Sequence, residues 1–385
     1  MGHRATAWRT TLVLVAATQL AAQLVFAGEP TSPGAGSRHA PDPRNDELLA
    51  ACGTGKQALH EVARAVVARS LRGEPPWSMV ELGEHVRARG EPYPIARAWT
   101  LRGSQIDRAV AVERLRAWLA SHDEGVPLRC GVASVVDSEL GEAVAVVAVP
   151  VLADLAVAIP RTVSQGRWVT VDAVVRVPVT SGKIVVLRPR GVPRGIPTAF
   201  DASAQRVSGR FMADHEGIWS VQVVATTASG PKPVIEVEFR VGDGKAKPSG
   251  SAPGEDAGQE LPDDQAMVAM INAARASEGL RWLVRDAVAD EVAREHVRGM
   301  MAAGIVGHDV GKGSPPERAS KAGLTSQEVG ENVSRASSVT LVHRALWKSP
   351  SHRANTLHSR YERVGVGAMR DARGVVWVAV LFVGR

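Results

Sequence analysis

The stretch Ser349-Pro350-Ser351-His352-Arg353-Ala354-Asn355 carries the sharpest structural signal in this 385-residue chain. Serine is a favoured helix N-cap and proline fits the first helical position, so the stretch predicts a short helix with His352 in its first turn. Upstream, Gly330-Glu331-Asn332 precedes a helix predicted over 339–347. His308 follows a helix predicted over 286–303.

Four motifs then stand in order along the last third of the chain. They are His308 after a helix, Gly330-Glu331-Asn332, Trp347 with Ser349–Asn355, and Val364-Gly365-Val366-Gly367 before a final strand pair. In order and in spacing (331 − 308 = 23; 352 − 331 = 21), residues 261–385 resemble a CAP domain, also called an SCP-like extracellular domain, of the compact bacterial type. The resemblance implies an α-β-α sandwich and a surface cleft lined by His308, Glu331 and His352.

The chemistry of that cleft stays open between several alternatives. Two neutral imidazoles and one carboxylate can supply three zinc ligands and leave a fourth position for water. Glu331 can instead serve as a general base, with the histidines moving protons. A structural role is the third alternative: Glu331 binds backbone donors and His352 stabilises a helix end. Asn332, Ser349 and Asn355 are expected to support the site.

One departure from the family pattern limits these alternatives. Larger members place a second glutamate shortly after the tryptophan, whereas Lys348, Ser349 and Pro350 follow Trp347 here. The missing carboxylate argues against a mechanism that needs two. The other histidines of this region (His296, His343 and His358) are expected to be packing or surface residues.

The first 27 residues are typical of a secretory signal. Arg4 and Arg9 make the start basic, and an apolar run follows. The run ends at Val25-Phe26-Ala27, which places small residues at the two positions that a signal peptidase recognises. We therefore expect a secreted or periplasmic protein of the cell envelope, without a membrane span once the signal is removed. Because such compartments are oxidising, Cys52 and Cys130 are predicted to form a disulfide.

Two segments rich in proline, glycine and serine, 28–44 and 242–260, are predicted to be linkers. Between them, 45–150 is predicted to be an α/β unit. Short strands with frequent turn signals over 151–241 predict an immunoglobulin-like β-sandwich. The overall class is therefore α/β, with three modules in series.

The sequence of the first module is similar to that of the last at two places. Glu81-Leu-Gly-Glu84 parallels Glu328-Val-Gly-Glu331, and Ser104-Gln-Ile-Asp107 parallels Ser349-Pro-Ser-His352. The separations are similar, 107 − 84 = 23 against 352 − 331 = 21. A degenerate CAP-like copy near 45–150, with Asp107 in place of the histidine, is one interpretation. Chance similarity between two α/β units is the other.

Composition and charge narrow the function classes. The formal net charge is +6, but the basic residues are spread along the chain, and Phe and Tyr, two of the residue types that stack on bases, number only five and two. We therefore expect no nucleic-acid partner. Two classes remain: an extracytoplasmic binding module for a lipid, an envelope polymer or a protein, and a metal-assisted hydrolase acting on peptide bonds through His308, Glu331 and His352.

Overall fold

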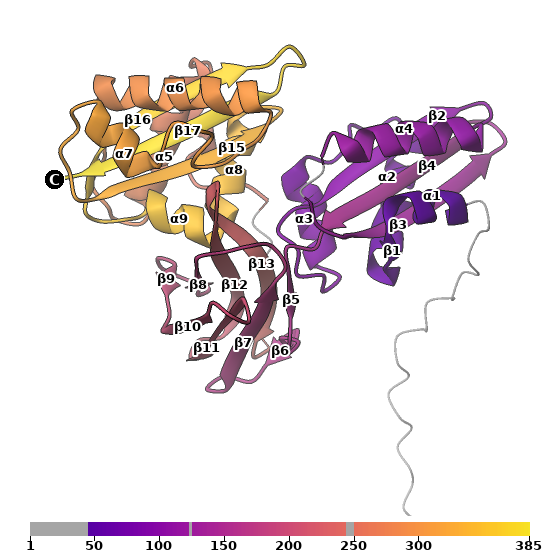
Figure 1. Cartoon of the computed structure of the whole chain (residues 1–385), viewed down its shortest axis with the longest axis horizontal. Helices are drawn as coiled ribbons and strands as arrows, with labels where there is room; N and C mark the ends of the chain where they lie inside the picture. Colours follow the sequence, from indigo (N-terminus) through magenta and orange to yellow (C-terminus); the bar gives the residue numbers. More distant parts are fainter. Residues whose placement is uncertain (1–44, 123–124, 244–249) are drawn as a thin grey trace, which may run out of the picture. The chain divides into compact units, whose positions relative to one another are not determined.

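The computed structural model describes residues 45–122, 125–243 and 250–385, which form three successive modules with cores of their own (Figure 1). The signal peptide predicted over 1–27 and the linker predicted over 28–44 lie outside the described residues. Within the described ranges, no helix has the length and apolarity needed to cross a membrane.

The N-terminal module packs helices on both faces of one sheet. Its helices are α1 (Asp46–Cys52), α2 (Gln57–Leu71), α3 (Met79–Arg87) and α4 (Arg108–Ala120); its strands are β1 (Thr54–Gly55), β2 (Arg97–Gly103), β3 (Leu128–Asp137) and β4 (Gly141–Pro150). One core lies under α2 and α3, and a second lies under α1 and α4. The predicted disulfide is confirmed: Cys52 on α1 is bonded to Cys130 on β3, across 78 residues of sequence.

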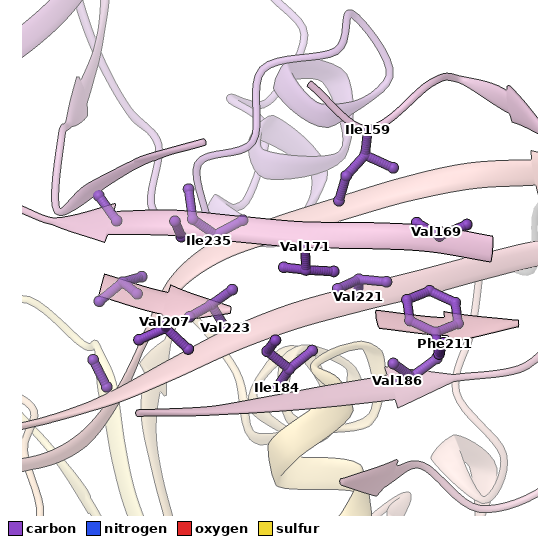
Figure 2. Close-up of a cluster of buried hydrophobic side chains, with 14 of the residues drawn as sticks. Ile159, Val169, Val171, Ile184, Val186, Val207, Phe211, Val221, Val223 and Ile235 are labelled. Carbon is purple, nitrogen blue, oxygen red and sulfur yellow. The ribbon is translucent and has the colours of Figure 1, made fainter. Parts of the chain in front are cut away.

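The middle module consists of two sheets, with strand orders β10-β11-β7-β5 and β6-β13-β12-β8-β9. The strands are β5 (Ala153–Leu155), β6 (Thr162–Val163), β7 (Trp168–Val175), β8 (Ser181–Leu187), β9 (Arg194–Gly195), β10 (Thr198–Asp201), β11 (Arg206–Met212), β12 (Gly217–Thr227) and β13 (Gly230–Val241). Figure 2 shows how alternate apolar side chains, such as Val171 of one sheet and Val221 of the other, fill the core. We call residues 153–241 the two-sheet module; an immunoglobulin-like topology stays a prediction.

The C-terminal module places the predicted site. Its elements are η2 (Glu255–Gly258), α5 (Asp263–Ser277), β14 (Val284–Arg285), α6 (Ala287–Ala303), α7 (Pro315–Lys321), β15 (Val329–Ala336), α8 (Val339–Lys348), α9 (Pro350–Thr356), β16 (Tyr361–Arg370) and β17 (Val376–Gly384). The strand order is β14-β16-β17-β15. Helices α5 and α8 share a core with one face of this sheet, and α6 and α7 with the other, which gives the expected α-β-α layers.

Local sequence explains where these helices begin and end. The Asp286 carboxylate accepts hydrogen bonds from the first N–H groups of α6, those of Val288 and Ala289, and Gly304 ends that helix in the left-handed region at φ 71°. Helix α9 begins at Ser349-Pro350, as predicted. Two glycines of β16 then let α6 approach closely, since a Cβ on Gly365 would lie 2.0 Å from the carbonyl carbon of Ala289.

The linker predicted over 242–260 is only partly a linker. Residues 250–260 are docked on the C-terminal module: Ala252 is buried and the Pro253 carbonyl accepts a hydrogen bond from His343 Nε2 at 2.9 Å. Glu255 pairs with Arg344 through two bonds of 2.7 Å. The composition-based expectation is therefore wrong for this half, because a few specific contacts offset the low apolar content.

The N-terminal and C-terminal modules share one strand arrangement. Strand order β1-β3-β4-β2 corresponds to β14-β16-β17-β15, and in each sheet the first pair is parallel and the others antiparallel. The residue matching expected from sequence is nevertheless wrong. Glu84 lies on helix α3 whereas Glu331 lies on strand β15, and Asp107 caps α4 rather than standing in a helix like α9.

Candidate functional site

Glu331 is the buried centre of the candidate site. It lies on β15 opposite Leu381 of β17, and its side chain is 1% exposed. Arg318 of α7 donates to Oε1, in an ion pair whose arginine side chain is 7% exposed. Oε2 lies 2.9 Å from Nδ1 of His308. Both carboxylate oxygens are therefore engaged by neighbouring side chains.

His308 is held in its loop by side chain and backbone together. Since the carboxylate of Glu331 can only accept, Nδ1 of His308 is the donor, and in the neutral tautomer with this bond Nε2 keeps its lone pair. Arg318 Nη1 also donates to the His308 carbonyl at 2.6 Å. The His308 side chain is 12% exposed. Glu331 and Arg318 thus fix the ring so that Nε2 is the free nitrogen.

His352 stands in the first turn of α9, and its carbonyl accepts a hydrogen bond from Asn332, the neighbour of Glu331 on β15. Its Nδ1 lies 2.8 Å from Ser349 Oγ. Burial is the main cause that lowers the pKa of His352 to about 3; the charge of Lys183, and that of His308 whenever it is protonated, act in the same direction. The imidazole is therefore neutral at physiological pH.

The predicted supporting asparagines tie β15 to α9. Asn332 is 1% exposed and its Nδ2 donates to the His352 carbonyl at 2.9 Å. Asn355 Nδ2 donates to the Glu331 carbonyl at 3.1 Å and to Asn332 Oδ1 at 3.0 Å. These bonds set the distance between the strand that carries Glu331 and the helix that carries His352.

Sequence reasoning missed two members of this cluster. His296 of α6 was expected to be a packing or surface residue, yet its Nε2 lies 2.8 Å from the Gly307 carbonyl and 3.5 Å from Glu331 Oε2. Burial is the main cause that lowers the pKa of His296, so it too is neutral. Arg318 gave no signal, because only the fold shows which of many arginines faces the carboxylate. His343 and His358 lie elsewhere, on Pro253 and Tyr361.

Trp347 of the third motif and Trp377 of β17 have packing roles. Trp347 and Trp377 are 7% and 2% exposed, and each lies under an arginine at cation–π distance: Arg353 at 4.0 Å and Arg335 at 4.6 Å from the ring centre. Their burial leaves the site to the histidines and the carboxylate.

Comparison with protein families identifies the domain that contains the site. The model of the family described as "CAP: Cysteine-rich secretory protein family" matches residues 268–382, which include all of these site residues from His296 to His352. The C-terminal module is a CAP domain. The chain matches no curated protein sequence.

Solved structures similar to this chain include three bacterial proteins. An outer surface protein from Borrelia burgdorferi is 20% identical, with a TM-score of 0.31, over 32% of this chain and 92% of its own. An extracellular protein containing a SCP domain from Bacillus anthracis is 16% identical, with a TM-score of 0.30, over 45% and 66%. A cysteine-rich secretory protein from Staphylococcus aureus is 14% identical, with a TM-score of 0.28, over 56% and 77%.

The CAP-domain residues do not fit the expected three-ligand zinc site. Glu331 directs its oxygens at Arg318 and His308, and its side chain is almost wholly buried. Among the described residues, no group of three or more His, Cys, Asp or Glu side chains is arranged to hold a metal. Of the three expected ligands, His308 and His352 each keep an Nε2 beside an engaged Nδ1, whereas both oxygens of Glu331 are engaged, which leaves two ligands rather than three.

The arrangement supports hydrogen-bonding chemistry. The Glu331–His308 pair leaves a lone pair on His308 Nε2, which can accept a hydrogen bond or a proton. His352 adds a second neutral imidazole nearby. A bound group that has both a donor and an acceptor, such as a hydroxyl, an amide or a water molecule, suits such a pair.

Proposed function

We propose that this protein is an extracytoplasmic binding protein, whose CAP domain recognises a lipid, an envelope polymer or a protein through the region of His308 and His352. The observation that carries the proposal is the engagement of Glu331: both oxygens serve Arg318 and His308, so the carboxylate positions a histidine instead of meeting a substrate. The imidazoles supply the direct contacts.

Export is supported by covalent chemistry as well as by the signal-like start. A disulfide such as Cys52–Cys130 persists in oxidising compartments and is rare in the cytosol. Secretion or a place in the cell envelope suits that bond. The positive net charge of +6 also favours approach to an anionic envelope surface.

A hydrolase remains a second candidate, on one specific observation. A buried carboxylate bonded to Nδ1 of a histidine whose Nε2 is free is the arrangement that orients a general base. In that function His308 would take a proton from water and Glu331 would stabilise the charged imidazolium. No metal is required in this route.

We further propose that the N-terminal module is a CAP-like unit without the site. Gly131 packs on Leu59 of α2 as Gly365 packs on Ala289 of α6, which aligns the two sheets. In that register Ala98 takes the place of Glu331. Val147 of β4 pairs with both Gly131 and Ala98. Leu381 of β17 pairs in the same way with both Gly365 and Glu331. We expect Ala98→Ser to leave every binding measurement unchanged.

The test compares binding with turnover on the same preparations. Wild type and a His308→Gln/His352→Gln variant are mixed with purified peptidoglycan, with phosphatidylglycerol vesicles and with an envelope-protein extract, and bound protein is measured by sedimentation or flotation. The same proteins are incubated with a mixed peptide library. We expect wild type to bind one material, the variant to lose that binding, and neither to cleave peptides.

The opposite result would support the hydrolase. Cleavage that the double variant abolishes, together with equal binding of both proteins to all three materials, contradicts the binding proposal. A His215→Gln variant is the matched control, because His215 is 60% exposed in a turn of the two-sheet module and its loss should change neither measurement.

A further inference from the structure

Gln222 lies on β12 of the two-sheet module, yet its side chain reaches the CAP domain. It is fully buried, and its amide oxygen accepts a hydrogen bond from the Ser351 N–H at 3.0 Å. That N–H belongs to the first turn of α9 and has no partner within the helix. Because the Ser349 hydroxyl does not cap α9, Gln222 does so from another module.

The amide nitrogen of Gln222 extends this contact toward His352. Nε2 donates to Ser349 Oγ at 3.0 Å and to Glu236 Oε2 at 2.8 Å. The orientation of the amide is set by its neighbours, since the Ser351 N–H needs an acceptor and the Glu236 carboxylate needs a donor. Ser349 Oγ in turn lies 2.8 Å from His352 Nδ1.

The direction of these bonds determines where His352 carries its proton. Ser349 Oγ receives an N–H from Gln222, and the only other described partner of that oxygen is His352 Nδ1. Each proton between Gln222 and His352 has an acceptor when the Ser349 hydroxyl donates to Nδ1 of His352. The proton of the neutral imidazole is then on Nε2. His352 then offers a donor, whereas His308 offers the lone pair of its Nε2.

The same module also contacts the loop of His308. The carbonyl of Ser229, in the turn between β12 and β13, accepts hydrogen bonds from the N–H groups of His308 at 2.8 Å and Asp309 at 3.1 Å. The next residue, Gly230, has φ 100°, and a Cβ built on it would lie 2.7 Å from Cβ of His308. The turn therefore fits against His308 without space for a side chain.

Glu236, which holds Gln222, is itself anchored by the N-terminal module. Arg87 of α3 pairs with Glu236 at 3.2 Å, and both side chains are 7% exposed. Loss of either partner of this buried ion pair would leave an uncompensated charge, so the pair favours the position in which Arg87 and Glu236 meet. The contacts thus run from Arg87 through Glu236, Gln222 and Ser349 to His352.

We propose that the two-sheet module completes the CAP site: Gln222 is the positioning residue of His352, and the Ser229 turn positions His308. The inference rests on the site proposed above but not on what that site binds or cleaves. Its consequence is an acceptor and a donor held at fixed orientation, which selects a ligand group that presents both a donor and an acceptor.

The first test reads the proton on His352 directly. In the full chain labelled with ¹⁵N-histidine, nuclear magnetic resonance at pH 7 distinguishes the two neutral tautomers, and His352→Gln assigns the signal. We expect wild type to show the Nε2–H form alone. Gln222→Met and Ser349→Ala should each let the Nδ1–H form appear, and the double variant should equal the single ones because both break one chain of bonds.

Hydrogen exchange gives a second readout of the same contact. The Ser351 amide should exchange about tenfold faster in Gln222→Met, the change expected for loss of one hydrogen bond. Gln165→Met is the matched control, since the Gln165 amide is exposed and bonds to the Asp214 carbonyl within the two-sheet module. If Gln222→Met does not fold, Ser349→Ala carries the test from the CAP side.

A third arm tests the turn. Gly230→Ala should shift the ring signals of His308, whereas Gly166→Ala should not, because Gly166 has a similar positive φ of 79° but no atom within 4 Å of a built Cβ. The inference is overturned if wild-type His352 carries its proton on Nδ1, or if the folded Gln222→Met protein keeps wild-type signals for His352. Equal effects of the two glycine variants on His308 would overturn the role of the turn.

Discussion

Replacing Arg318 by methionine tests the claim that the CAP site is built around a buried ion pair. The arginine side chain is 7% exposed and that of Glu331 is 1% exposed, so the substitution leaves a carboxylate in the interior without its cation. Removing one partner of a buried pair typically costs about 3–5 kcal/mol. The lost bonds to the carbonyls of His308 and Gly313 add to this.

Native-state hydrogen exchange is the suitable assay, because a chain of several modules does not unfold in one step. The amides of β16 and β17 report opening of the CAP domain alone. A cost of about 3–5 kcal/mol corresponds to exchange faster by roughly two to four powers of ten, up to the limit set by the domain's own stability. Amides of the two-sheet core, such as Val221, should change little.

Two companion variants make the result interpretable. Arg298→Met removes an exposed pair with Glu291, at 3.2 Å and with both side chains about half exposed, and should cost less than about 1 kcal/mol. Glu331→Gln added to Arg318→Met removes the uncompensated charge and should restore part of the protection. An Arg318→Met protein whose β17 amides exchange within tenfold of wild type would refute the reasoning.

Further expectations concern the disulfide, the pH and the close helix contact. Reducing Cys52–Cys130, which closes a loop across 78 residues, should destabilise the N-terminal module by up to about 4 kcal/mol while CAP-domain exchange stays unchanged. His352 takes up a proton near its ordinary pKa of about 6.5 in the unfolded chain, but only near about 3 in the folded protein. Its contribution to stability should therefore be complete above pH 6.5 and should be lost as the pH falls from 6.5 toward 3. His352→Gln should flatten this pH dependence in acid titrations followed by fluorescence. Gly365→Ala should lower CAP-domain stability by about 1–3 kcal/mol or more in exchange measurements, whereas Gly250→Ala, with open space around it, should not.

Local signals in the sequence were sufficient for helix α6 and for the start of helix α9, whereas helix α7, which carries Arg318, was not predicted. Asp286 and Gly304 bound α6 within one residue of the expected range, and Ser349-Pro350 starts α9. These signals work because capping depends on side chains only two or three positions from the backbone groups they satisfy. Short strands such as β9 and β14 lack a comparable local signal, since pairing with a distant strand defines them.

The comparison of the first and last modules shows the limit of matching by residue type. Similar letters suggested that Glu84 parallels Glu331, but the shared strand order aligns Ala98 with it instead. Strand register is set by which faces are buried, so a glycine under a helix is a better guide than a matching carboxylate.

By itself the sequence determined the order of the modules, the resemblance of the last one to a CAP domain, and the residues His308, Glu331 and His352 as its candidate site. Tertiary structure alone decided what those residues do. Arg318 and His296 join the site through packing, and Gln222 meets Ser349 across 127 positions of sequence. The partner of a buried polar group is chosen by the fold, because a carboxylate or an amide bonds to whichever donor or acceptor is enclosed with it.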